Sequence, residues 1–208
     1  MVSAIAHLAN VSFTSGTFPA VMKHGLVTPL LKKPGLDAGD MKNFRPVTHL
    51  STISKILERL VSARLKSHIT ASQNFCGLQS AYRKRHSTET ALCFILDDIV
   101  SSIDDGHHVA LMSLDISAAF DAVPHDALVH RLDEEFGISA TCSQWIASYL
   151  ADRSYSVRVG TSTSSQLPMS SGVPQGSVLG PMPYTAYMAP VDRLIASYGV
   201  HFHVYAYE

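Results

Sequence analysis

A short apolar run that ends on an acid is the feature that most constrains the fold of this chain. Residues 109–114, "VALMSL", are nearly all apolar and lack a helical period, and the turn signal "DDG" precedes them. Such a run is typical of a buried strand, here one that ends at Asp115. Burying a carboxylate is costly unless it is compensated, so Asp115 requires a metal ion, a basic partner or a helix N-terminus. Taken alone, a turn or helix cap is the commoner use of such a residue.

The composition is that of a folded chain. The 208 residues, 46% of them hydrophobic and 16% charged, suffice for one medium domain or for two lobes that share a core. A formal net charge of −1 gives no general attraction to nucleic-acid phosphates, so such contacts must come from local patches. The clearest patch is "RKRH" at residues 83–86, and a run of this kind is usually a solvated charged surface.

Cysteine usage and hydropathy indicate the compartment. Cys76, Cys93 and Cys142 form no CxxC pair, which argues against a zinc knuckle or disulfide framework and favours free buried thiols in a reducing compartment. No apolar run reaches the roughly 18 residues that a membrane span needs. The first residues also lack the pattern of a secretory signal. We expect an intracellular protein without membrane contacts, and the nucleus and the cytoplasm both remain open.

The periodicity of apolar residues predicts an α+β fold with helices packed on an antiparallel sheet, because helices and strands mix without strict alternation. Helices are expected at about 54–69, 87–103, 124–136, 141–153 and 181–198. Strands are expected at about 24–33, 109–115, 154–160 and 200–206, with a turn-rich connector at 32–46. Pro190 should kink or shorten the last helix.

Particular residues are expected to cap or bury these helices. Ser51 or Ser54 should cap the first helix, and Ser87 or Thr88 the second. The residues predicted to face inward are Ile53, Ile56, Leu57, Leu60, Val61 and Leu65 in the first, Leu92, Leu96 and Ile99 in the second, and Trp145, Ile146, Tyr149 and Leu150 in the fourth.

Two further stretches carry binding chemistry. In "SGVPQGSVLGP", residues 171–181, the glycines allow close approach of a ligand, and Gln175 offers an amide donor and acceptor. This loop lacks the ending of a P-loop, and a tight structural turn explains it equally well. In "QSAYRKRHSTETAL", residues 79–92, three cations stand just ahead of a predicted helix, an arrangement suited to phosphate oxygens.

Five motifs in this order closely resemble the reverse transcriptase domain of non-LTR (LINE-type, jockey-like) retrotransposons, from about residue 18 to 206. "FPAVMKHGLVTPLLKKPG" resembles the start of that domain, and "NFRPVTHLSTISKILERLV" and "QSAYRKRHSTETAL" resemble its two fingers motifs. "LDISAAFDAV" is similar to polymerase motif A and "SGVPQGSVLGP" to motif B. The resemblance implies a right-hand polymerase without a thumb: an N-terminal extension at 1–17, a fingers-like region at 18–108 and a partial palm at 109–208.

The resemblance also implies a nucleotidyltransferase chemistry, in which a DNA primer on an RNA template is extended with dNTPs. Asp115 and the carbonyl of Ile116 would bind two catalytic Mg²⁺ ions, or Mn²⁺ in their place, since hard cations take oxygen ligands. Phe120 matches the aromatic residue that selects deoxynucleotides.

Four further residues match nucleotide contacts of the family. Gln175 and Gly176 correspond to the pair that positions the incoming nucleotide against the template. Arg83 is similar to the fingers cation on the triphosphate, and Arg45 is expected near the template or the nucleotide.

The last residues depart from the family pattern Tyr/Phe-Ala-Asp-Asp. Here "YAYE" places Tyr207 at the position of the metal-binding aspartate and Glu208 beside it. A phenol with a pKa near about 10 cannot replace a carboxylate at neutral pH. Losing one of two metal-bridging carboxylates should cost on the order of a thousandfold in rate. We therefore expect an inactive polymerase fragment, truncated or produced by a gene-model artefact, or alternatively a non-catalytic nucleic-acid-binding remnant of the same fold.

Overall fold

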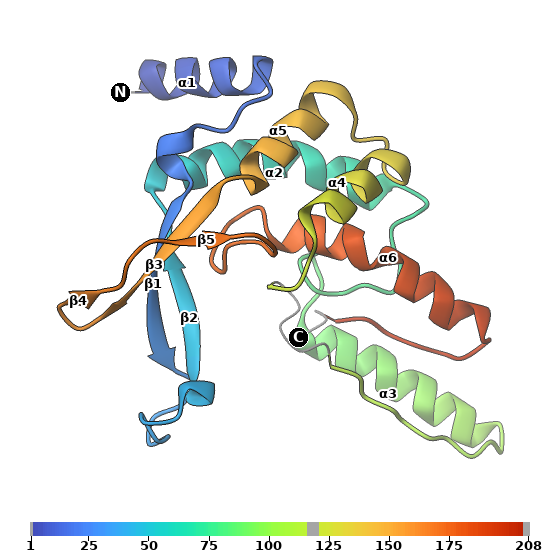
Figure 1. Ribbon diagram of the computed structural model, residues 1–208. Coiled ribbons are helices and arrows are strands. Elements are labelled where there is room, and N and C mark those ends of the chain that lie inside the picture. Colours follow the sequence, from blue (N-terminus) through green and yellow to red (C-terminus); the bar gives the residue numbers. More distant parts are fainter. Residues whose placement is uncertain (1, 116–120, 206–208) are drawn as a thin grey trace.

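The computed structural model describes residues 2–115 and 121–205, which form an α+β fold, as the sequence predicts (Figure 1). The helices are α1 (Val2–Thr14), α2 (Thr52–Ala71), α3 (Thr88–Asp104), α4 (His125–Glu134), α5 (Ala140–Leu150) and α6 (Pro181–Ser197). The strands are β1 (His24–Leu31), β2 (Phe44–His49), β3 (Arg153–Val159), β4 (Ser162–Thr163) and β5 (Leu167–Met169), and two 3₁₀ turns are η1 (Ala20–Met22) and η2 (Met41–Asn43). No helix among these residues is long and apolar enough to cross a membrane.

The sheet is mixed, whereas an antiparallel sheet was expected. Its order is β2-β1-β3-β4, and β5 pairs with the other part of β3. β1 and β2 are antiparallel, with Leu26 opposite His49, but β1 and β3 are parallel, with His24 opposite Ser154. Parallel neighbours need a long crossover connection, and the chain from α2 to α5 supplies it.

The core lies between α2 and the helices α4, α5 and α6, with α1 packed on α5 (Figure 1). α2 buries Leu57, Val61, Leu65 and Ile69 on one face, so three of the six residues predicted to face inward are buried. The prediction is wrong for Ile53 and Leu60, which are 38% and 37% exposed, and Ile56 is half-buried. Ser51 caps this helix by accepting a hydrogen bond from the Ser54 amide at 3.1 Å, one of the two caps that the sequence allowed. In α5, the four residues predicted to face inward are all buried, and they are Trp145, Ile146, Tyr149 and Leu150.

Aromatic rings join the first segment of the chain to α5. The ring of Phe18 is almost fully buried and meets the rings of Trp145 and Tyr149 edge-on, with centroids 5.5 and 5.1 Å apart. The Trp145 indole donates a hydrogen bond to the Ser12 hydroxyl of α1 at 2.9 Å. Edge-on aromatic pairs add stability beyond the area that they bury. Phe18 therefore links α1 and β1 to the helical core.

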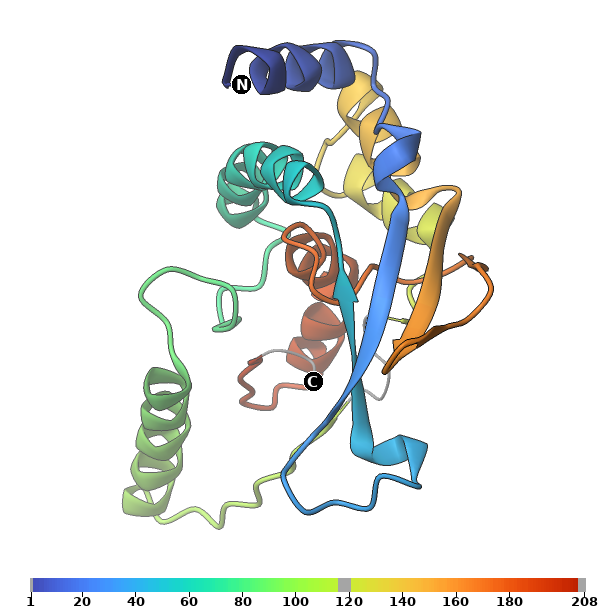
Figure 2. The same cartoon turned by 90° about the vertical axis from the view of Figure 1, so that its left-hand side faces the viewer.

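Helix α3 forms as predicted, but its predicted inward face is wrong. Ser87 caps it in a reciprocal pair with Thr90. Leu92 and Leu96 are 54% and 57% exposed, and Ala91 is the helix residue that is buried. Figure 2 shows α3 standing apart from the other helices. Its described contacts come from the segment 201–205 instead, where the ring of His203 lies 5.0 Å from that of Phe94 and His201 contacts Asp98 at 2.7 Å.

Two predicted strands are wrong as well. Residues 107–115 adopt no strand, and Leu111, Met112 and Leu114 are 71%, 80% and 77% exposed. Residues 200–205 contribute a single bridge, in which Val204 pairs with Gln79. A strand requires a neighbouring strand to satisfy its backbone, and within the described part of the chain none lies beside 107–115.

The cysteines are free thiols, as expected, but two of them are exposed. Cys93 and Cys142 are exposed, and only Cys76 is partly buried. Burial, followed by the nearby charge of Asp192, raises the pKa of the Cys76 thiol to about 11. This thiol is therefore protonated and unreactive at neutral pH.

Pro190 does not shorten α6. The helix continues beyond this residue to Ser197, close to the end predicted from the sequence. Pro181 occupies its first position, where a missing amide proton costs nothing.

Replacing Phe18 by alanine tests the link between α1, β1 and α5. Phe18→Ala should lower the free energy of unfolding by about 3–5 kcal/mol, because it removes a fully buried ring and leaves a cavity. Urea unfolding followed by tryptophan fluorescence would measure the loss. Val21→Ala is the control, since Val21 is 90% exposed in the same segment and its change should stay within about 0.5 kcal/mol. Equal losses in the two variants would contradict this account of the core.

Candidate active site

The loop predicted to position a nucleotide lies between β5 and α6, and the end of β2 holds it. The Thr48 amide donates a hydrogen bond to the carbonyl of Gln175 at 3.2 Å. Gly176 has a φ of +92°, and a Cβ placed there would lie 3.1 Å from the Thr48 carbonyl oxygen. Glycine is therefore required here both by the backbone conformation and by the close approach of β2.

A buried carboxylate on α2 holds the same loop three residues further on. Glu58 is fully buried, and its Oε2 accepts hydrogen bonds from the amides of Val178 at 2.7 Å and Leu179 at 3.2 Å. Its Oε1 accepts a hydrogen bond from the Ser54 hydroxyl at 2.9 Å. Sequence reasoning missed Glu58, although a signal was present: the residue lies one turn from Ser54 on the buried face of α2.

A buried cation lies near this carboxylate. Arg153, at the start of β3, is 2% exposed, and its guanidinium lies 4.0 Å from the centre of the Tyr149 ring. Its Nε donates to the Tyr149 carbonyl, whereas Nη1 and Nη2 have no hydrogen-bond partner among the described residues. Burial lowers the pKa of Arg153, and its electrostatic interactions with Tyr149 and Glu58 oppose that shift. Burial also raises the pKa of the Tyr149 hydroxyl, so this group stays neutral.

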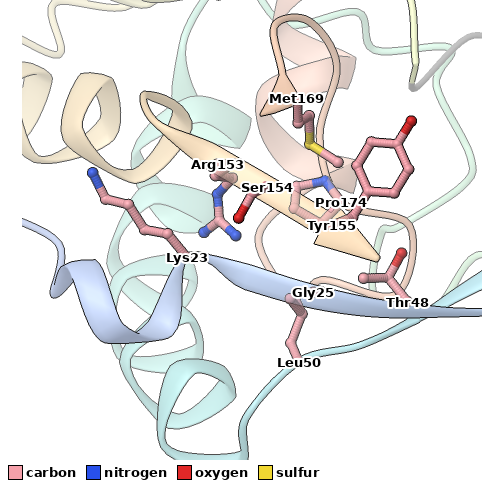
Figure 3. A pocket seen from close by; sticks show the side chains of 9 residues that line it. All are labelled: Lys23, Gly25, Thr48, Leu50, Arg153, Ser154, Tyr155, Met169 and Pro174. Atoms are coloured by element: carbon pink, nitrogen blue, oxygen red, sulfur yellow. The ribbon is translucent and has the colours of Figure 1, made fainter. Parts of the chain in front are cut away.

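Figure 3 shows the cavity that the Arg153 guanidinium enters. Thr48 and Pro174 line the cavity together with Lys23 and Gly25, so the loop, β1 and β2 meet at this point. Burial lowers the pKa of Lys23; the charge of Asp152 opposes this shift, and the charge of Arg153 adds to it. The cavity leaves no room for a ligand, because the side chains around it pack closely at the base of the loop.

Arg83 folds back onto its own segment. Its Nη1 donates to the carbonyls of Gly77 and Gln79, both at 2.8 Å, and the guanidinium lies over the ring of Phe75. Lys66 of α2 donates a hydrogen bond to the carbonyl of Tyr82, the residue just before Arg83. Helix α2 thus contacts both the segment that carries Arg83 and the loop that carries Gln175.

A cavity of about 280 Å³ lies beside this segment. Arg85, His86, Phe94 and His203 line it, so its wall combines a guanidinium and two imidazoles with an aromatic ring. Burial, followed by the nearby His86, lowers the pKa of His203. Arg85 has a φ of +65°, a conformation that is unfavourable outside glycine.

The remaining predicted site residues are not brought into this arrangement. Asp115 was expected at the end of a buried strand but is exposed, and among the described residues it has no hydrogen bond or ion pair. Arg45 is exposed on β2, opposite Leu30. Ile116, Phe120, Tyr207 and Glu208 lie outside the described residues.

The described residues do not by themselves form a metal centre. Over residues 2–115 and 121–205, no group of three or more His, Cys, Asp or Glu side chains is placed to hold an ion. Asp115 alone would supply a single carboxylate, which is too little for a bound divalent cation.

Comparisons with known proteins agree on one family. Residues 31–206 match the model of the family described as reverse transcriptase (RNA-dependent DNA polymerase). A probable RNA-directed DNA polymerase from transposon BS of Drosophila melanogaster is 34% identical over 191 residues, 90% of this chain and 21% of that protein. The corresponding protein of the X-element is 32% identical over 82% of this chain and 18% of its own length.

The RNA-directed DNA polymerase from the mobile element jockey of Drosophila melanogaster is 29% identical over 93% of this chain and 22% of its own length. This chain thus spans about a fifth of the length of the curated relatives that it matches. The matched family model covers most of the chain, and the relatives are named as transposon polymerases. The chain therefore belongs to the reverse transcriptase family, among the RNA-directed DNA polymerases of non-LTR retrotransposons.

Proposed function

We propose that this chain is the fingers and partial palm of an RNA-directed DNA polymerase, and that it binds a dNTP opposite an RNA template and a DNA primer. Residues 18–108 would form the fingers-like region and 109–208 the partial palm, after an extension at 1–17. The observation that carries this proposal is the anchored loop, in which Thr48 holds Gln175 and Gly176 at the end of β2.

The chemistry of Gln175 supports a nucleotide contact. Its carbonyl is occupied by the Thr48 amide, while its half-buried side-chain amide has no hydrogen-bond partner among the described residues. An amide can donate to and accept from a nucleotide at once. The backbone anchor fixes where this side chain begins, so less freedom is lost when a ligand binds.

Arg83 is suited to a triphosphate even though its side chain folds back. A guanidinium carries five N–H groups, and Nη1 alone serves the two carbonyls of Gly77 and Gln79. Nε and Nη2 remain to donate to phosphate oxygens, from a group whose orientation is already set. We propose that Arg45 lies near the template or the nucleotide, on the same strand as Thr48.

A divalent cation, Mg²⁺ or Mn²⁺, would supply the charge stabilisation for the in-line attack of the primer hydroxyl on the α-phosphate. Asp115 would be one ligand, with the Ile116 carbonyl beside it, and Phe120 would select deoxynucleotides. Tyr207 stands where the family has a second carboxylate, and Glu208 is one position further on. We propose that the chain binds nucleotides but incorporates none.

A binding assay with Gln175→Ala tests the proposed nucleotide contact. The affinity for a dNTP in the presence of an RNA–DNA primer-template should fall about tenfold, because one or two hydrogen bonds are lost. Isothermal titration calorimetry would measure it. Gln73→Ala, at an exposed position near the end of α2, is the matched control and should leave the affinity unchanged. Primer-template binding without any dNTP binding would favour the non-catalytic nucleic-acid-binding alternative, and it should weaken with salt.

Restoring the missing acid tests the proposed reason for inactivity. Tyr207→Asp should raise the affinity for Mn²⁺ about tenfold, since hard cations prefer carboxylate oxygens and a second carboxylate adds to Asp115. Electron paramagnetic resonance of free Mn²⁺ would measure the change. Adding Asp115→Asn should cancel the gain, and Tyr198→Asp, at a residue 76% exposed, should produce none. An unchanged affinity in Tyr207→Asp would show that this position does not correspond to the family's aspartate.

A further inference from the structure

The buried carboxylate of α2 has a role that the family motifs do not assign. We propose that Glu58 is a positioning residue for the loop of residues 170–180, here called the nucleotide loop. It holds the backbone of Val178 and Leu179, and thereby fixes where Gln175 and Gly176 lie. This inference rests on the proposed function of the loop. The role is one of positioning, because Glu58 touches backbone amides and would not touch the nucleotide.

The contacts of the carboxylate are directed at the loop. The amides of Val178 and Leu179 both donate to Oε2 of Glu58. Its other oxygen, Oε1, accepts a hydrogen bond from the Ser54 hydroxyl of the same helix. Bonds from amides to an ionised acceptor are shorter and stronger than bonds between neutral groups. An alternative role would be an ion pair with Arg153, but within the described residues no nitrogen of that side chain lies within 4.0 Å of the Glu58 oxygens.

Two residues hold this loop, each at a different point of its backbone. Thr48 holds it at Gln175, and Glu58 holds it at Val178 and Leu179. The turn between them contains Gly176 at a φ of +92° and Ser177, whose hydroxyl accepts the Gly180 amide at 3.0 Å. Glycine permits many backbone conformations, so a loop with a single anchor would not hold Gln175 in one place.

The buried position explains why the anchor is a carboxylate. The Leu179 amide lies in the core beside side chains of α2, where water does not replace a lost acceptor. An amide left without an acceptor in such a place is costly. A hydrophobic residue at position 58 would fill the space but would leave both amides unsatisfied, so the loop would have to move.

Amide hydrogen exchange of the 208-residue protein tests the proposal directly. In Glu58→Gln, which keeps the volume and one acceptor oxygen, the Val178 and Leu179 amides should exchange about tenfold faster, because the acceptor is no longer charged. The Ile138 amide, which donates to the Leu132 carbonyl at 2.9 Å away from the loop, is the internal reference and should not change. Ser54→Ala is the matched control, since it removes only the partner of Oε1 and should leave both loop amides protected.

The dNTP affinity of the same variants completes the test. Glu58→Gln should weaken dNTP binding about tenfold, and Ser54→Ala should not. If the Val178 and Leu179 amides exchange as slowly in Glu58→Gln as in the wild type, Glu58 is no anchor and the proposal is overturned. Faster exchange with unchanged dNTP affinity would overturn its positioning role. A wild-type protein that binds no dNTP would instead overturn the proposed function, a result independent of the exchange rates.

Discussion

The arrangement of the candidate site depends on the hydrogen bonds between the Glu58 carboxylate and the amides of Val178 and Leu179, because they join α2 to a loop about 120 residues away in the chain. Two other contacts leave the same helix. Lys66 donates to the carbonyl of Tyr82, and His68 contacts the carbonyl of Phe136 at 2.6 Å. The segments that carry Gln175 and Arg83 are thus held by one helix, whose own position is set by its buried apolar face. Removing that face would separate all of these segments together.

Two charged side chains in the core are tolerated because each one meets polar or aromatic groups. Glu58 is surrounded by three hydrogen-bond donors, and Arg153 stacks on Tyr149 and faces Phe18. The desolvation cost of a buried ion is offset only by such contacts. Arg153 is the less satisfied partner, since two of its nitrogens have no acceptor among the described residues. The Glu58 carboxylate raises the pKa of Arg153 and so partly offsets the effect of burial, in an interior where electrostatic interactions are weakly screened.

Much of the helical structure could be predicted from the sequence, and the errors share one physical cause. Trp145 and Tyr149 are buried as predicted because α5 has neighbours on its apolar side. Leu92 lies on a helical stripe and Leu111 in an apolar run, but both are exposed, since no described helix or strand packs against them. The spacing of apolar residues shows which of them can share a face of a helix, but it does not show whether another element covers that face. Glu58 is a different kind of error, because its role was not predicted at all. A charged residue among the buried residues of a helix indicates a hydrogen-bond partner, here the amides of Val178 and Leu179.

The residues that hold the nucleotide loop are distinct from Asp115, the residue proposed to bind a metal ion. The anchors of the nucleotide loop come from β2 and α2, through Thr48 and Glu58, and neither involves the segment around Asp115. Asp115 lies in an exposed stretch without strand pairing, so no described element fixes its direction. A change at position 115 would therefore leave the hydrogen bonds of Thr48 and Glu58 to the loop in place.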